Sequence, residues 1–378
     1  MPDFKPARRL RPLPSLLPLI ACALAAGLAH AEAPCRVAYD IGSSGIRAGA
    51  SNSAMTTRAG IDYLAALREH GSLETSIAPT IAALDEPFRK RLFDARCARA
   101  GGGFSAWRLA LQQDVGKLIP ALTAIRAATG VAVIVVPQNV EGAYGYRGAR
   151  RLLGDRLATS HVLDIGGGSL QIAGERSTFG DAIGQKLWHQ QVCQALGRPG
   201  GLPCGLSPMT NNELAAVRAL LATRLASVRA SLGGPVTLTA ISRPVTHGVA
   251  PAVERLLGKP AGQGRLSQAE LGSAIAQLAG MTLADTATRL GIAPAYAAYL
   301  LSDMLLVDGL MTASGVSDLQ VAEVDLTNIP GLLSDDTAYR WADNYGCYLA
   351  RLAKDGLTAY ASDTASCYGR TPAGPQPR

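Results

Sequence analysis

Two short stretches rich in glycine and serine carry the side chains best suited to chemistry. The first, DIGSSGIR, covers 40–47, and the second, DIGGGSLQ, covers 164–171. Each follows an apolar run, opens with an aspartate and leads into a second apolar run, which predicts a β-hairpin with a Gly/Ser turn. Glycine lets the backbone approach a ligand closely, and successive N–H groups with serine hydroxyls form an anion-binding hollow. Because the pattern occurs twice, we expect a clamp for a phosphate chain rather than two ordinary hairpins.

The two aspartates, Asp40 and Asp164, end the strands that open these hairpins. Carboxylates in that place can orient the water shell of Mg²⁺ or Ca²⁺. Such a cation neutralises charge that develops on a phosphate being displaced. The alternative role of a strand-end aspartate is to cap its turn. We favour the cation site, with Mg²⁺ or Ca²⁺ as the cofactor.

Two further charged residues are candidates for catalysis. Glu141 follows the continuous apolar run 131–136, which is typical of a strand buried on both faces. A carboxylate there can face a cleft and take a proton from attacking water, or it can simply complement the helix dipole. Arg108 follows the glycines at 101–103 and either contacts a terminal phosphate or points to solvent. The residues alone leave both choices open.

Composition narrows the class of protein. Of 378 residues, 48% are hydrophobic and 17% are charged, as in a soluble globular protein with more than one core. The formal net charge of +7 is compatible with an anionic substrate. No dense basic run is interleaved with aromatic residues, so nucleic-acid binding has no support. Neither a P-loop nor a Ser/His/Asp set with nucleophile spacing occurs.

The first 31 residues have the pattern of an export signal. A basic start precedes the apolar run 16–28, and Ala29-His-Ala31 matches a small-x-small cleavage site. The run is short for a membrane span, contains Pro18 and follows directly after Pro14. No other segment is long and apolar enough to cross a bilayer. We expect cleavage after Ala31 and a periplasmic or secreted protein. Lipoprotein processing at Cys22 is the less favoured alternative.

Removal of that segment leaves six cysteines, an even number that predicts disulfides in an exported chain. Cys193 with Cys204 would close a loop rich in glycine and proline. Cys347 with Cys367 would hold the C-terminal end, which leaves Cys35 with Cys97. Sequence alone permits fifteen pairings. Metal ligation by these cysteines is a weak alternative, because no Cys-x-x-Cys or close Cys/His cluster occurs.

The order of expected elements indicates an α/β protein built twice. In the first half we expect a hairpin over 36–50, helices over 61–70 and 77–100, and a break at 101–103. A helix over 104–128, a buried strand over 131–136 and a helix over 138–157 are expected to follow. In the second half, capping boxes at Thr210 and Ser267 open helices. Strands are expected at 236–241 and 319–324, with an apolar helix at 296–310 between them.

These elements predict a first domain over 32–157 and a second over 158–333. The residues from 334 to 378 are expected to form a helical or disordered tail, because they are more polar and end in Pro/Gly-rich sequence.

In this order the motifs resemble those of the actin-like phosphotransferase superfamily. Two of its families fit: exopolyphosphatase/guanosine pentaphosphatase (Ppx/GppA) and apyrase (nucleoside triphosphate diphosphohydrolase). The stretch 40–47 is nearly the apyrase form, 105–109 (SAWRL) is a looser match, and 141–146 (EGAYGY) is close. The stretch 163–172 stands between the families, since Gly168 matches the polyphosphatases and Gln171 the apyrases.

The resemblance implies two duplicated actin-like (ribonuclease H-like) α/β domains with a phosphate-binding cleft between them. It implies Glu141 as the base that activates water, Arg108 as a second catalytic residue, and Asp40 and Asp164 at the metal. The implied phosphate-binding residues are Gly42, Ser43, Ser44, Gly45, Arg47, Gly166, Gly167, Gly168, Ser169 and Gln171.

The chain departs from both families. Val140 and Gln171 stand where polyphosphatases have acids, and Ile46 and Leu170 stand where apyrases have threonines. The C-terminal base-stacking motif of apyrases is not found.

The function expected from these features is that of an exported phosphoanhydride hydrolase, acting on inorganic polyphosphate or nucleoside tri- and diphosphates by metal-assisted in-line attack of water. A phosphate- or nucleotide-binding module that has lost hydrolysis is the alternative, and a sugar-kinase-like transferase is a further rival. The expected partner is a phosphorylated small molecule or polyphosphate and not a nucleic acid. We expect no membrane span. A homodimer is one possible oligomeric state.

Overall fold

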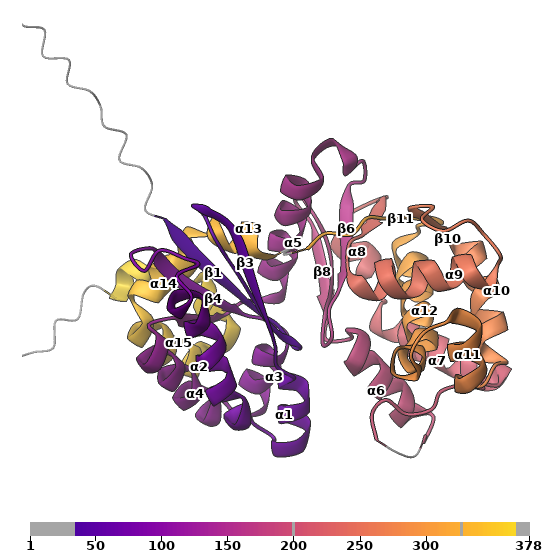
Figure 1. Ribbon diagram of the computed structural model, residues 1–378, viewed down its shortest axis with the longest axis horizontal. Coiled ribbons are helices and arrows are strands. Elements are labelled where there is room, and N and C mark those ends of the chain that lie inside the picture. Colours follow the sequence, from indigo (N-terminus) through magenta and orange to yellow (C-terminus); the bar gives the residue numbers. More distant parts are fainter. Residues whose placement is uncertain (1–34, 199–200, 326–327, 368–378) are drawn as a thin grey trace, which may run out of the picture. The chain divides into compact units, whose positions relative to one another are not determined.

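The computed structural model describes residues 35–198, 201–325 and 328–367 (Figure 1). The expected export signal, with Cys22, lies outside the described residues, as does the end of the chain from 368. From Cys35 onward the chain forms one compact unit by its contacts. The boundaries expected at 157/158 and 333/334 stay predictions.

The first sheet has the strand order β3-β2-β1-β4-β5. Its strands are β1 (Arg36–Ile41), β2 (Gly45–Ala50), β3 (Ser53–Gly60), β4 (Ala98–Gly103) and β5 (Ala132–Val135). β1 and β2 form the predicted hairpin, in which Asp40 pairs with Arg47. β3 continues this antiparallel meander, whereas β4 and β5 run parallel to β1. The sequence did not predict β3, because most of its side chains are exposed and show no apolar alternation.

The helix expected over 77–100 is wrong at its C-terminal end. α2 covers Glu74–Arg89, and the chain then enters β4, whose last three residues are the glycines expected to form a break. Alanine and glycine have low strand propensity, so nothing local indicated a strand. The tertiary structure requires small residues there: a Cβ on Gly102 would lie 2.5 Å from the ring of Phe104, which folds back over the end of the strand.

The other helices of this half are α1 (Tyr63–His70), α3 (Ala106–Gln113), α4 (Val115–Thr129) and α5 (Gln138–Leu153). The single helix expected over 104–128 is thus two helices. Asp114 divides them, because its extended backbone ends α3 while its side chain accepts a hydrogen bond from the Lys117 N–H at the start of α4. This side chain satisfies an amide that has no partner within the new helix.

The second sheet has the order β10-β11-β9-β6-β7-β8. Its strands are β6 (His161–Ile165), β7 (Leu170–Gly174), β8 (Thr178–Asp181), β9 (Leu238–Ala240), β10 (Arg265–Ser267) and β11 (Asp318–Val321). β6, β7 and β8 repeat the antiparallel meander of the first sheet, with Asp164 opposite Gln171, and β9 continues in parallel from β6. The prediction of a duplicated α/β fold is confirmed.

Helices of the second half are α6 (Gln185–Ala195), α7 (Asn211–Arg224), α8 (Val228–Leu232), α9 (Ala250–Leu256), α10 (Gln268–Ala279), α11 (Leu283–Leu290) and α12 (Pro294–Ser314). The capping boxes at Thr210 and Ser267 are both formed. Among the described residues, no helix alone has the length and apolar composition needed to span a bilayer; α11 and α12 meet those two criteria only as a pair bent by 99°.

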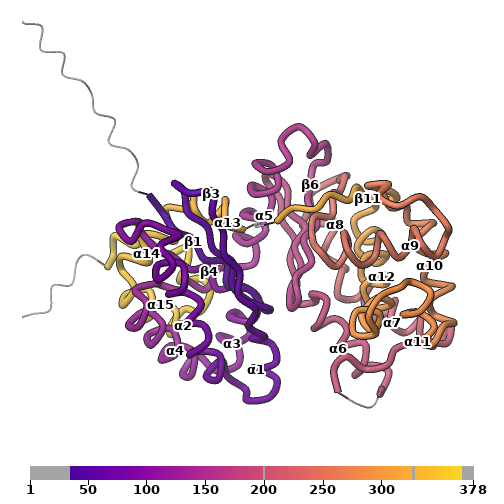
Figure 2. Tube along the Cα trace, in the orientation of Figure 1, coloured from indigo at the N-terminus to yellow at the C-terminus, as the bar shows by residue number. Residues whose placement is uncertain are grey.

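The chain returns to the first sheet after β11. α13 (Asn328–Leu333), α14 (Asp336–Asp343) and α15 (Tyr345–Asp355) follow, and Figures 1 and 2 show α14 and α15, in yellow, beside the indigo and violet elements. Trp341 and Tyr348 are fully buried in the core that also contains Tyr39 and Val133. Over the described part of 334–378, the expected tail is therefore helical and belongs to the first core.

The three expected disulfides are present: Cys35–Cys97, Cys193–Cys204 and Cys347–Cys367. The first ties the start of β1 to the start of β4, and the last ties α15 to the end of the described chain.

Candidate functional site

A cavity of about 340 Å³ lies where the two Gly/Ser turns meet. Its lining includes Gly42 to Arg47 from the first turn, and Gly166, Gly167, Ser169 and Gln171 from the second. The turns approach each other directly, since a Cβ on Gly167 would lie 2.7 Å from Ser43 Oγ and 3.0 Å from Ser44 Oγ. Gly45 has a φ of +149°, and a Cβ there would collide with the Ala59 carbonyl oxygen, so the turn needs glycine at that position.

Asp40 and Asp164 both line this cavity, at the ends of β1 and β6. Burial raises the pKa of Asp40 to about 7; the charge of Arg47 opposes this, and the neighbouring charges of Glu141 and Asp164 add to it. Three acidic groups thus act on one another in a buried place. Such an arrangement is unfavourable without compensating positive charge, which is the condition a bound cation would meet.

Asn328, which the sequence did not single out, completes this acidic group. It opens α13 and is only 6% exposed. Its Nδ2 donates to Asp40 Oδ2 at 3.5 Å, while its Oδ1 is buried and accepts no hydrogen bond from the described residues. A Cβ on Gly145 would lie 3.8 Å from Asn328 Oδ1 and 3.9 Å from Asp164 Oδ2. Both oxygens therefore border the same small region.

Carboxylate and side-chain amide oxygens are the ligands that Mg²⁺ and Ca²⁺ prefer. Asp40, Asp164 and Asn328 therefore fit a divalent cation, and the unpartnered Asn328 oxygen is the observation that favours it. No sequence spacing could have indicated Asn328, because it lies far along the chain from both aspartates.

Glu141 lies in the first turn of α5 and lines the cavity, although it is buried. Arg108 Nη2 lies 2.6 Å from Glu141 Oε2, and Gln171 Nε2 donates to the same oxygen at 2.9 Å. Both donors use Oε2, so the carboxylate is held in one orientation and Oε1 keeps its lone pairs for another partner. A carboxylate fixed in this way can act as a general base.

Arg108 does not belong to the cavity lining. Its guanidinium is buried, donates to the Val136 carbonyl oxygen at 3.0 Å and to Ser169 Oγ at 3.1 Å, and pairs with Glu141. The structure therefore places it behind Glu141, where it fixes the carboxylate. Gly168 is likewise outside the lining. Every other residue expected to bind phosphate or metal lines the cavity.

Three arginines add positive charge to the lining. Arg47 and Arg58 are opposite each other on β2 and β3 and thus point to the same face of the sheet, and Arg243 follows β9. Within the described part of the chain, the residues that line this cavity include no Tyr, Phe or Trp. The sequence did not indicate Arg58, because β3 was not predicted. Ser105, from the stretch 105–109, also lines the cavity, and lining residues that the sequence did not single out include Gln185, Ser242 and Pro244.

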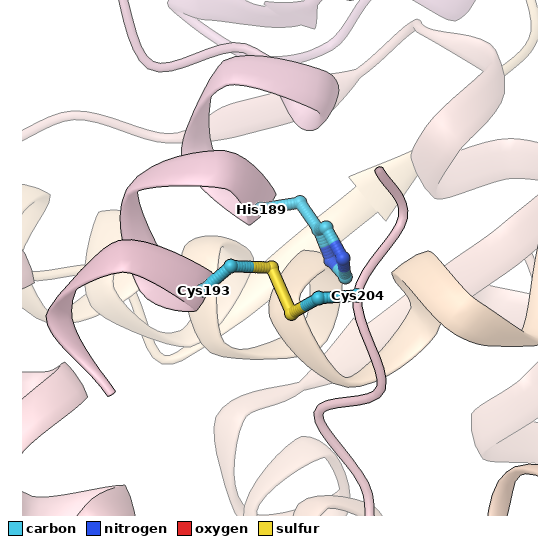
Figure 3. A group of neighbouring side chains, drawn as sticks. All are labelled: His189, Cys193 and Cys204. Atoms are coloured by element: carbon cyan, nitrogen blue, oxygen red, sulfur yellow. A yellow bond between two sulfur atoms is a disulfide. The ribbon is translucent and has the colours of Figure 1, made fainter. Parts of the chain in front are cut away.

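A second group of potential ligands consists of His189 and Cys193, which project from α6, and Cys204, which lies on the segment after it (Figure 3). The two sulfur atoms form a disulfide, so neither cysteine is a thiolate that could bind a metal. Burial lowers the pKa of His189 to about 4, and its Nδ1 pairs with Ser302 Oγ at 3.0 Å. Cys35 and Cys97, near Asp94, are also disulfide-bonded. Both groups are structural.

Comparison with known proteins places the fold. No protein-family model matches the chain. An uncharacterized protein of Streptomyces coelicolor is 28% identical over 209 residues, and the alignment covers 52% of this chain and 58% of that protein. The chain thus spans less than two thirds of the length of the curated relative it matches.

The solved structures are more informative. A Ppx/GppA family member from Aquifex aeolicus superposes with a TM-score of 0.60 at 18% identity, over 79% of this chain and 96% of that one. An exopolyphosphatase from Cytophaga hutchinsonii gives a TM-score of 0.58 at 14% identity, over 82% and 98%. The resemblance to Ppx/GppA proteins is therefore confirmed for the fold, which is the actin-like one.

Proposed function

We propose that this protein hydrolyses phosphoanhydride bonds and releases the terminal phosphate of inorganic polyphosphate. The observation that carries the proposal is Glu141, held by Arg108 and Gln171 at the wall of a cavity that two Gly/Ser turns enclose. A pure binding site has no need of a carboxylate fixed in this way. The fold shared with structures named as Ppx/GppA proteins and exopolyphosphatase supports the same reaction class.

In this mechanism the N–H groups and hydroxyls of the two turns bind the terminal phosphoryl group. Glu141 Oε1 accepts a proton from a water molecule, whose oxygen attacks the terminal phosphorus. The P–O bond to the rest of the chain breaks in line, and the leaving phosphate oxygen takes the electron pair. A divalent cation held by Asp40, Asp164 and Asn328 would supply positive charge for the phosphoryl oxygens.

Arg108 and Gln171 contribute by position. Both donate to Oε2, so they fix the orientation of the carboxylate and leave Oε1 to contact the water. Ser169 links the two donors, because its Oγ accepts from Arg108 and from Gln171. Its place in the second turn couples the base to the phosphate-binding backbone.

Polyphosphate is favoured over a nucleotide by the composition of the cavity. Arg47, Arg58 and Arg243 add positive charge to the lining, which suits an extended polyanion. A nucleobase is commonly held by stacking on an aromatic ring, and none is found among the described residues that line the cavity.

We also infer that the protein works after export. Three disulfides are stable in an oxidising compartment, and the N-terminal sequence has the pattern of a signal with cleavage after Ala31.

The test is phosphate release from tripolyphosphate, long-chain polyphosphate, ATP, ADP and GTP, each with Mg²⁺ or Ca²⁺. Wild type is compared with Glu141→Gln, and with Glu74→Gln as a control, because Glu74 is an exposed glutamate in the first turn of α2. We expect Glu141→Gln to lose about 100- to 10,000-fold in rate, the usual contribution of a general base, and Glu74→Gln to match wild type.

Three results would change this reading. Equal release by Glu141→Gln would remove Glu141 as the base. Release from nucleotides alone would replace polyphosphate as the substrate. Binding of tripolyphosphate without release from any compound would favour the binding module, a role consistent with the burial of Ile46 and Leu170 where apyrases have threonines.

A further inference from the structure

Ser105 occupies an unusual place between β4 and α3. Its φ is +43° and its ψ is −92°, a conformation that residues with a side chain rarely adopt. It is the N-cap residue of α3, yet its hydroxyl forms no capping hydrogen bond with that helix. Serine is favoured at the N-cap because its oxygen accepts from the first N–H groups. Here the backbone turns the hydroxyl away from that task.

The hydroxyl has no other partner within the described residues. Ser105 is 6% exposed, its Oγ is buried without a hydrogen bond, and the residue lines the cavity. A buried hydroxyl that pairs with nothing is unfavourable. Together, the unusual backbone conformation and the unpaired hydroxyl indicate that Ser105 contacts a ligand in the cavity.

The position of the hydroxyl indicates what that ligand is. A Cβ on Gly168 would collide with Ser105 Oγ, just as a Cβ on Gly167 would approach Ser43 Oγ and Ser44 Oγ. Three serine hydroxyls of the first half therefore converge on two consecutive glycines of the second Gly/Ser turn. Hydroxyl donors around bare backbone N–H groups form a site for a compact oxyanion.

We propose that Ser105 Oγ donates a hydrogen bond to the phosphoryl group that is attacked. This inference rests on the proposed function and extends it. Arg108, the charged residue nearest to Ser105 in sequence, pairs with Glu141, so we assign the contact with the phosphoryl group to the Ser105 hydroxyl. The hydroxyl is a donor and not a nucleophile: no base among the described residues accepts its proton. The phosphoryl oxygen gains charge in the transition state, so the hydrogen bond strengthens there.

The decisive variant is Ser105→Gly. Glycine adopts a positive φ without strain, so the backbone of this connection is preserved and only the hydroxyl is lost. Ser105→Ala also removes the hydroxyl but keeps a Cβ. Ser314→Ala serves as the control, because Ser314 is a buried serine at the end of α12 whose hydroxyl donates to the Leu310 carbonyl oxygen, outside the cavity.

With tripolyphosphate and Mg²⁺, we expect kcat of Ser105→Gly to fall about 10- to 100-fold, the effect of one lost hydrogen bond to a charged group. KM changes far less, and the thermal unfolding midpoint stays at or above that of wild type. Ser105→Ala loses a similar factor in kcat, and Ser314→Ala keeps wild-type kcat. Calorimetric titration with tripolyphosphate should show weaker binding by Ser105→Gly, with a loss in affinity smaller than the loss in kcat.

A wild-type kcat for Ser105→Gly would overturn this inference and leave the proposed function intact. If wild type binds tripolyphosphate without releasing phosphate, the proposed hydrolysis fails, and the titration then tests the Ser105 contact by itself. Weaker binding by Ser105→Gly would support that contact, and equal binding would overturn it. If wild type neither binds nor hydrolyses tripolyphosphate, both proposals fall together.

Discussion

Replacing Arg108 by methionine tests the arrangement that holds Glu141. The guanidinium and the carboxylate lie 2.6 Å apart and their side chains are only 6% and 10% exposed. Methionine keeps much of the volume but leaves the Glu141 charge without its cationic partner. Removal of one partner of a buried ion pair costs about 3–5 kcal/mol. The Val136 carbonyl oxygen and Ser169 Oγ lose a donor at the same time.

We expect urea unfolding, followed by far-ultraviolet circular dichroism, to show Arg108→Met less stable by about 3–5 kcal/mol. The double variant Arg108→Met/Glu141→Gln carries no unpaired charge, so its loss should be smaller than the sum of the two single losses by about 1–3 kcal/mol. Arg265→Met is the control. It breaks the exposed pair of Arg265 and Asp318, which contributes about 0–1 kcal/mol.

An Arg108→Met loss no greater than that of Arg265→Met would refute the reasoning, and so would strict additivity in the double variant. Either result would mean that Arg108 does not hold Glu141, and the orientation of the base would need another explanation.

Three further predictions concern other parts of the chain. Asn328→Leu should weaken binding of Mg²⁺ or Mn²⁺, titrated alone by calorimetry, about 10-fold or more; unchanged affinity would remove Asn328 from the cation site. Burial raises the pKa of Asp303 to about 8, so its stabilising contribution is complete below the unfolded pKa near 4 and is lost as pH rises through 8. The free energy of unfolding in urea should therefore differ less between pH 5 and pH 8 for Asp303→Asn than for wild type. The same difference in both proteins would contradict that pKa. Cys35→Ser/Cys97→Ser opens a link across 62 residues and should cost about 4 kcal/mol of unfolding free energy; a loss under about 1 kcal/mol would count against this estimate.

The C-terminal helices show how an assignment from local pattern can fail. The residues from 334 are polar enough to be read as a tail, yet Trp341, Tyr345, Tyr348 and Leu352 recur at helical spacing and enter the first core. The spacing was present in the sequence, but nothing in it indicated that a sheet formed 200 residues earlier would receive this face. The contact depends on the chain returning after β11, which is a property of the whole topology.

The sequence by itself determined the chemistry-bearing turns. Asp40, Asp164, Glu141 and the glycines and serines beside them were found from residue type and order, because turns, strand ends and helix starts have local rules. The two capping boxes were predicted for the same reason, since each depends on one helix turn. The even number of cysteines indicated disulfides, but the sequence permits fifteen pairings, and the structure decided which three form.

The tertiary structure decided what these residues do together. Arg108 was expected at the phosphate and lies behind Glu141; Asn328, Arg58 and Ser105 gained their places only when distant segments met. Contacts between such segments depend on three-dimensional packing, which spacing along the chain does not encode. The strand β4 is the plainest case. Its glycines have little strand propensity, and it forms because it pairs with β1 and β5. The ring of Phe104 leaves no room for a larger residue at Gly102.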